Sequence, residues 1–76
     1  MPHVIVKMYA GRTEPEKVRL AEEIAKAVQT AIGSAEKSIS VAIEDVVPED
    51  WTDRVYEPDI KAKWDTVYKK PGYDPL

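Results

Sequence analysis

The sequence predicts an α/β (α+β) fold in one domain, residues 1–76, built on a β-α-β unit with parallel strands. Apolar and polar residues alternate over residues 3–9 and again over 39–44, which is typical of half-buried strands. Between these segments, apolar residues recur with the spacing of an amphipathic helix. A strand, a helix and a second strand in this order favour a right-handed crossover between parallel strands.

The first strand alternates between two faces. Val4, Val6 and Met8 lie on one face, and the other face carries His3, Ile5, Lys7 and Tyr9. Because Ile5 is on the more polar face, we expect that face to be partly covered as well. Ala10-Gly11-Arg12 follows as a turn, in which Gly11 can adopt a positive φ.

A capping box predicts the start of the helix. The Thr13 side chain can accept from the amide of Glu16, and the Glu16 side chain can reach back to Thr13. Pro15 falls in the first turn, where its missing N–H has no cost. The apolar stripe runs from Val18 to Ile32 and is rich in alanine, which predicts close approach to a sheet. Gly33 provides the stop.

The second strand follows a short connection. Residues 34–38 are expected to form a loop or one short turn. Ile39, Val41 and Ile43 then lie on one face, whereas Ser40, Ala42 and Glu44 lie on the other. The predicted strand therefore covers residues 39–44.

The segment after this strand is predicted to contain a short turn and a second helix. Pro48 can open a short helical turn that carries Trp51, and residues 52–54 are expected to be a connection. Pro58 predicts a helix start. That helix would end at Lys69-Lys70, two cations that suit the negative end of a helix dipole, with Ile60, Trp64, Val67 and Tyr68 on one face. Residues 71–75 are expected to be a tail.

Composition excludes several classes of protein. The chain has no cysteine, which removes disulfides and thiolate chemistry, and its single histidine, His3, excludes a His-rich metal site. The net charge of −3, with acids and bases interspersed, is unlike a nucleic-acid footprint. No apolar run approaches a membrane span, and Lys7 and Arg12 interrupt any signal peptide. We expect a soluble, cytoplasmic protein.

Size predicts self-association. A chain of 76 residues has a marginal core of its own, and two strands alone do not make a stable sheet. Without disulfides or metals, oligomerisation is the remaining remedy. We expect a homodimer with a four-stranded sheet and helices packed on one face; a hexamer stays open.

The first two residues, Met1-Pro2, raise a chemical possibility. Removal of Met1 would leave Pro2 as a free secondary amine, held still by the strand that follows. Such an amine can take up and release a proton near neutral pH, as a general base or acid must. Most proteins that begin Met-Pro make no chemical use of the proline, so the rest of the chain must show whether Pro2 is catalytic.

The order of motifs resembles the 4-oxalocrotonate tautomerase-like family of the tautomerase superfamily. These motifs are Met1-Pro2, the alternating strand, Gly11-Arg12, the capped helix, residues 38–44 and an aromatic residue near position 51. The match covers residues 2–51, and residues 48–73 are similar to a dimeric branch with a longer C-terminal helix.

The resemblance implies a cofactor-independent keto-enol tautomerase without a metal. Its substrates would be enols of 2-keto acids, either phenylpyruvate-like compounds or 2-hydroxydienoates. By position, Pro2 matches the catalytic base, Arg12 a residue that binds the substrate carboxylate, and Trp51 an aromatic wall of the site. Ser40 stands where well-known members have a second arginine. A hydroxyl cannot replace a bidentate cation, which favours a monocarboxylate over a dicarboxylate.

Alternatives stay open at this point. A dehalogenase-like hydrolase of the same superfamily would need a residue that activates water, and Glu44 is a candidate. A non-catalytic interaction module would leave Pro2 without a role. Trp64 is expected in the core or at an interface, and His3 has no assigned role. The sequence does not distinguish among four tyrosines, Tyr9, Tyr56, Tyr68 and Tyr73.

Overall fold

The structure is a computed structural model that describes residues 1–76. Its main elements are β1 (His3–Tyr9), α1 (Glu14–Ile32), β2 (Ser40–Val46) and the π-helix η3 (Thr52–Lys61). Three short 3₁₀ turns complete it: η1 (Glu36–Ser38), η2 (Pro48–Asp50) and η4 (Trp64–Thr66). The strands are parallel, with His3 opposite Ser40 and Tyr9 opposite Val46. The predicted β-α-β unit is confirmed.

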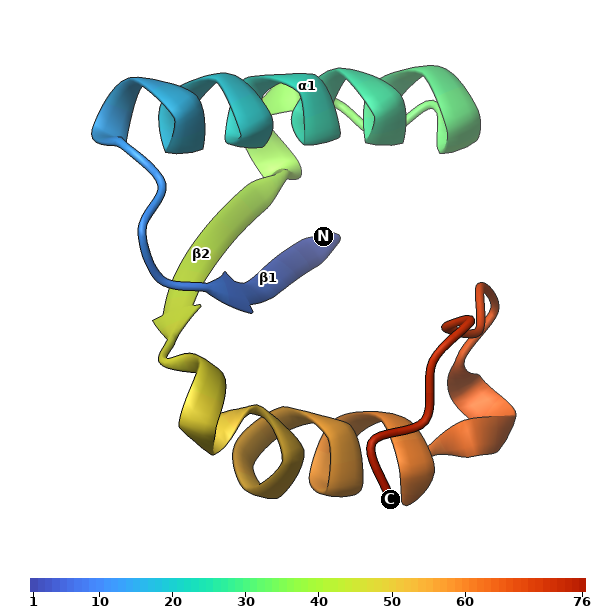
Figure 1. Ribbon diagram of the computed structural model, residues 1–76. Coiled ribbons are helices and arrows are strands. Elements are labelled where there is room, and N and C mark those ends of the chain that lie inside the picture. The colour runs from blue at the N-terminus through green and yellow to red at the C-terminus, as the bar shows by residue number, and fades with distance from the viewer.

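The sheet lies between two helical layers (Figure 1). On one face, Lys17 of α1 pairs with Asp45 of β2, with Nζ 2.7 Å from Oδ2. On the other face, Lys7 of β1 pairs with Asp59 of η3 at 2.5 Å. The expectation that the helices pack on one face is therefore wrong within the protomer. The face that carries Lys7 also buries Val46, which is 3% exposed, and this apolar contact draws the C-terminal helix to it.

The capping box of α1 is confirmed. The amide of Glu16 donates to the Thr13 hydroxyl at 3.3 Å, and the amide of Thr13 donates to the Glu16 carboxylate at 2.9 Å. At the other end, Gly33 has φ 69° and donates its N–H to the carbonyl of Gln29 at 3.0 Å. Only glycine adopts this left-handed conformation at little cost. Both ends of α1 are thus fixed where the sequence indicates.

Thr13→Ala should destabilise the fold by about 1 kcal/mol, because the first turn loses a capping acceptor. The backbone hydrogen bond from Thr13 lowers the pKa of Glu16. A carboxyl group with a lowered pKa stabilises the fold above its unfolded pKa, and this is lost as pH falls through the folded value. Urea unfolding should therefore give a lower free energy of unfolding for the variant than for the parent at neutral pH, and the difference should shrink in acid. Thr30→Ala, on the exposed face of α1, is the control. Equal stability of the Thr13 variant and the parent at neutral pH would contradict the capping role.

The predicted C-terminal helix is wrong in its position. The prediction placed it from Pro58 to Lys69-Lys70, but η3 begins at Thr52 and ends at Lys61, with Pro58 inside it. Residues 52–54, expected to be a connection, form its first turn. Val55 and Tyr56 are each 5% exposed, so their burial fixes the helix where the proline pattern does not. The short turn at Pro48 before Trp51 is confirmed.

The protomer has a small core. Three residues are buried, Val46, Val55 and Tyr56, and all lie on the η3 side of the molecule. Ile5 and Tyr9 on β1 are about half exposed, at 53% and 54%. Neither edge of the two-stranded sheet is paired. None of the helices combines the length and apolar character needed to span a bilayer.

Candidate active site

The start of the sheet brings Pro2 and Ser40 together. The amide of Ser40 donates to the Pro2 carbonyl at 3.2 Å, which ties the residue before β1 to the first residue of β2. Pro2 is partly buried. The parallel register also sets His3 opposite Ser40, with Nδ1 2.5 Å from Oγ. The sequence named Ser40 as a candidate but did not indicate that His3 would be its partner.

Arg12 and Trp51 lie at the opposite end of the sheet. The amide of Ala10 donates to the carbonyl of Val46 at 3.0 Å, so the connections after β1 and β2 leave the sheet side by side. Arg12 follows β1 on the way to α1, and Trp51 follows β2 on the way to η3, toward the other face (Figure 1). The Arg12 side chain is 66% exposed, and its guanidinium is 3.4 Å from the Glu16 carboxylate. This weak contact leaves most of the Arg12 fork available to a ligand.

The length of β1 separates the two groups. The strand has seven residues, and a rise of about 3.3 Å each places its ends about 20 Å apart. Within one chain, Pro2 and Arg12 therefore lie too far apart to share a substrate-sized site, whereas Trp51 folds back along β1 and lines a hollow with Ile5. The structure brings two of the four predicted site residues together and places the other two at the far end.

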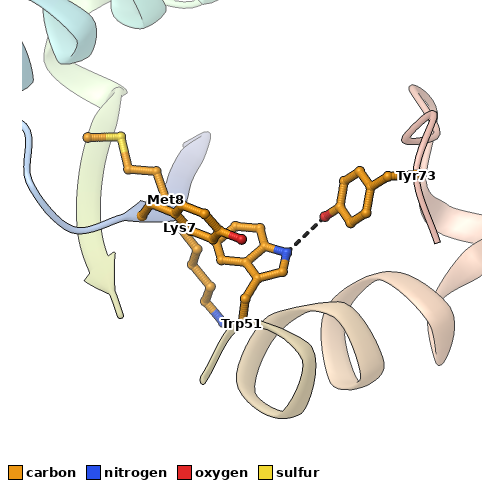
Figure 2. A pocket seen from close by; sticks show the side chains of 5 residues that line it. Lys7, Met8, Trp51 and Tyr73 are labelled. Atoms are coloured by element: carbon orange, nitrogen blue, oxygen red, sulfur yellow. Dashed lines mark hydrogen bonds between the residues drawn. The ribbon is translucent and has the colours of Figure 1, made fainter. Parts of the chain in front are cut away.

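A pocket of about 350 Å³ lies beside Trp51 (Figure 2). Its lining consists of Lys7, Met8, Tyr9, Trp51 and Tyr73. The rings of Tyr9 and Trp51 meet edge to face, with centroids 5.2 Å apart. The indole Nε1 of Trp51 donates to the Tyr73 hydroxyl at 2.8 Å. Trp51 is thus an aromatic wall, as expected, but its pocket does not include Pro2.

The charge at this pocket is already paired. The hydrogen bond to Asp59 raises the pKa of Lys7, although partial burial works in the opposite direction. Lys7 is therefore a cation at neutral pH, and its ammonium is held by a carboxylate of η3. Arg12 makes a looser contact and is the better candidate for binding a substrate anion.

The tyrosines and Trp64 have different surroundings. Tyr9 and Tyr73 line the pocket, while Tyr56 is buried and burial raises the pKa of its phenol. Tyr68 is fully exposed. Trp64 is 41% exposed, with the ammonium of Lys70 5.1 Å from its ring centroid. It is therefore not a core residue of the protomer, and the alternative expectation, an interface position, stays a prediction. No group of three or more His, Cys, Asp or Glu side chains is placed to hold a metal ion.

The parallel β-α-β unit of this chain matches a known protein family. The family model described as tautomerase enzyme matches residues 2–53, and the chain belongs to this family of isomerases. A probable tautomerase of Xylella fastidiosa (strain 9a5c) is 42% identical over 76 residues, covering 100% of this chain and 93% of its own. Tautomerase PptA of Pectobacterium atrosepticum is 45% identical over 74 residues, covering 96% and 97%.

Solved structures agree with the fold. YwhB, described as a homologue of 4-oxalocrotonate tautomerase, superimposes with a TM-score of 0.59 at 41% identity, over 60% of this chain and 75% of its own. TomN, a 4-oxalocrotonate tautomerase homologue of tomaymycin biosynthesis, gives 0.64 at 28% identity, over 66% and 77%. The YwhB match covers 60% of this chain and the TomN match 66%, whereas the PptA relative aligns along 96% of it.

Proposed function

We propose that the protein is a cofactor-independent keto-enol tautomerase for enols of 2-keto acids, with Pro2 as general base after removal of Met1. The substrates are phenylpyruvate-like enols or 2-hydroxydienoates. The position of Pro2 carries the proposal. It is partly buried at the start of an ordered strand, and the Ser40 amide holds its carbonyl. A free amine at this point would have a fixed direction, which general-base catalysis requires.

The proposed reaction moves one proton between oxygen and carbon. The neutral amine of Pro2 takes the proton from the enol hydroxyl, or from the carbon beside the carbonyl. It then returns a proton to the other atom, so no electrons leave or enter the substrate. Arg12 pairs with the carboxylate and stabilises the charge that develops on the enolate oxygen. An apolar wall at Trp51 favours the uncharged amine, because the ammonium form is poorly solvated there.

A site with these residues requires more than one copy of the chain. Pro2 lies at one end of β1, Arg12 lies beyond the other end, and Trp51 packs against Tyr9 near that second end. If the free β1 edges of two copies paired antiparallel about a two-fold axis, the start of one strand would meet the end of the other. Pro2 of one copy would then approach Tyr9 and the pocket of the second. Pairing would also cover exposed Ile5 and Tyr9. We therefore propose a homodimer, and a hexamer built from such dimers also fits.

The polar groups favour a substrate with one carboxylate. Ser40 is neutral and already hydrogen-bonded to His3, and Lys7 is paired with Asp59. Arg12 is the candidate cation with a mostly unoccupied hydrogen-bonding fork. One arginine binds one carboxylate in bidentate fashion, so an aryl-pyruvate enol fits better than a dicarboxylate.

The experiment that tests the proposal follows the absorbance of the phenylpyruvate enol with protein whose Met1 removal is confirmed by mass spectrometry. We expect acceleration above the buffer rate, and slower turnover of a 2-hydroxydienoate that carries two carboxylates. No acceleration for any of several 2-keto acid enols would contradict the proposed function.

A further inference from the structure

The C-terminal segment contributes to the pocket although it lies outside the tautomerase family match. That match ends at residue 53, and the chain after η3 folds back toward the sheet (Figure 1). Figure 2 shows the result: the Tyr73 side chain points its hydroxyl toward Trp51, and this hydroxyl accepts the indole N–H at 2.8 Å. A residue 22 positions further along the chain therefore fixes a side chain of the tautomerase unit.

The indole of Trp51 is held from two directions. Tyr9 on β1 meets it at an interplanar angle of 83°, and Tyr73 accepts its N–H. The indole has one polar atom, its N–H, and in the protomer this partly exposed group donates to the Tyr73 hydroxyl. Without the Tyr73 hydroxyl, the ring could rotate toward solvent to satisfy that atom. The two contacts together favour the orientation of the indole that the structure shows.

Tyr73 is itself anchored to the core. Its ring lies against Tyr56, with centroids 5.6 Å apart; Tyr56 is 5% exposed, and Tyr73 keeps 48% of its surface exposed. Val67 and Pro71 of the same segment are partly buried, which adds support on the way back from η4. A continuous aromatic chain therefore runs from the buried Tyr56 through Tyr73 and Trp51 to Tyr9. The segment acts as a brace for the indole.

We propose that Tyr73 is a positioning residue that holds Trp51 as a wall of the pocket, and that this wall selects a flat aromatic side chain on the 2-keto acid. The choice of ligand rests on the proposed function. Three of the five lining residues present aromatic rings, and Lys7 is paired with Asp59. Rings prefer edge-to-face or offset contacts with other rings, so an aryl group gains more here than an alkyl chain.

Tyr73→Phe keeps the ring and removes only the hydroxyl acceptor. In processed protein, kcat/KM for the enol of phenylpyruvate should fall about two- to tenfold, the size of one lost neutral hydrogen bond. Most of the change should appear in KM, and the enol of 2-oxohexanoate should be less affected. Tyr68→Phe, at a fully exposed site in the same segment, should leave kcat/KM unchanged for both substrates.

A double-mutant cycle separates positioning from a general loss of stability. Trp51→Phe removes the indole N–H, so adding Tyr73→Phe to it should lower the aryl preference no further. Additive losses would overturn the proposal, because Tyr73 would then act independently of the indole. The proposal would also be overturned if Tyr73→Phe left the ratio of kcat/KM for the aryl substrate to kcat/KM for the alkyl substrate unchanged. Dissociation of this variant to monomers with an unchanged ratio would overturn it as well, because Tyr73 would then act at an interface between copies.

A binding measurement keeps this inference separate from the catalytic one. Replacing Trp64 by Phe leaves Trp51 as the only tryptophan, so its fluorescence reports on the pocket. In that background, Tyr73→Phe should make Trp51 more accessible to acrylamide. It should also weaken binding of 3-phenylpropanoate about two- to tenfold relative to hexanoate. If the wild-type chain has no tautomerase activity, the proposed function fails. The quenching and binding measurements still test whether Tyr73 positions Trp51. Equal quenching and equal affinities in parent and variant would overturn the role of Tyr73.

Discussion

Retention of Met1 should lower the tautomerase rate by about 10²- to 10⁴-fold, the usual contribution of a general base. A preceding residue converts the nitrogen of Pro2 into an amide, which has no basic lone pair. The rest of the site would stay in place, because Pro2 contacts Ser40 through its carbonyl, which the extension does not alter. The comparison needs two preparations of one sequence, with and without Met1, each verified by intact mass.

Two variants show whether the effect belongs to the amine. Processed Pro2→Ala keeps an α-amino group, but a primary and more mobile one, so its activity should fall without vanishing. His3→Ala should leave the rate–pH midpoint in place, because the base in this account is the Pro2 amine and not the neighbouring imidazole. Similar rates with and without Met1 would rule out the proline mechanism and favour the interaction-module alternative.

Arg12→Ala should lower kcat/KM for a 2-keto acid enol by about ten- to hundredfold, the effect of one lost hydrogen bond to a charged group. A rise in KM alone would indicate uniform binding of the carboxylate, and a fall in kcat would indicate stabilisation of the enolate. Arg19→Ala removes an exposed arginine of α1 and serves as the charge-matched control. Unchanged kinetics in the Arg12 variant would remove this residue from the site.

Mixed oligomers test whether one site uses two copies. A Met1-retaining chain has an intact Arg12 but a blocked Pro2 nitrogen. A processed Arg12→Ala chain has a free Pro2 amine but lacks the arginine. If each site takes the two residues from different copies, refolding the inactive forms together should restore part of the activity. If the activity of the mixture is no higher than the average of the two separate proteins, each site takes Pro2 and Arg12 from the same copy. That result would contradict the proposal of a site shared between two copies.

Local signals were sufficient for the β-α-β unit. Alternation defined β1, and the Thr13–Glu16 capping box with Gly33 defined the ends of α1. The second strand was slightly misjudged: it covers Ser40–Val46, whereas the sequence predicted residues 39–44. Val46 continues the strand because it is 3% exposed beneath η3, a tertiary contact that alternation does not report.

The C-terminal third depended on long-range contacts. Pro58 suggested a helix start, yet burial of Val55 and Tyr56 places η3 around it. Trp51 was a candidate from the sequence, but its hydrogen bond to Tyr73 spans 22 positions and follows no periodic pattern. The strand register, which alternation does not fix, makes Pro2 and Ser40 neighbours, whereas the separation of Pro2 from Arg12 already follows from a strand over residues 3–9.

The ionisation of Pro2 tests the central claim most directly. Processed protein labelled with ¹⁵N-proline can be titrated by NMR while kcat/KM for phenylpyruvate enol is measured over the same pH range. The pH dependence of kcat/KM reports the essential base of the free enzyme. The account predicts that the Pro2 nitrogen and the rate share one midpoint, with activity rising as the amine loses its proton, and that His3→Ala leaves both in place. A rate that does not follow the Pro2 titration, or that follows His3 instead, would contradict it.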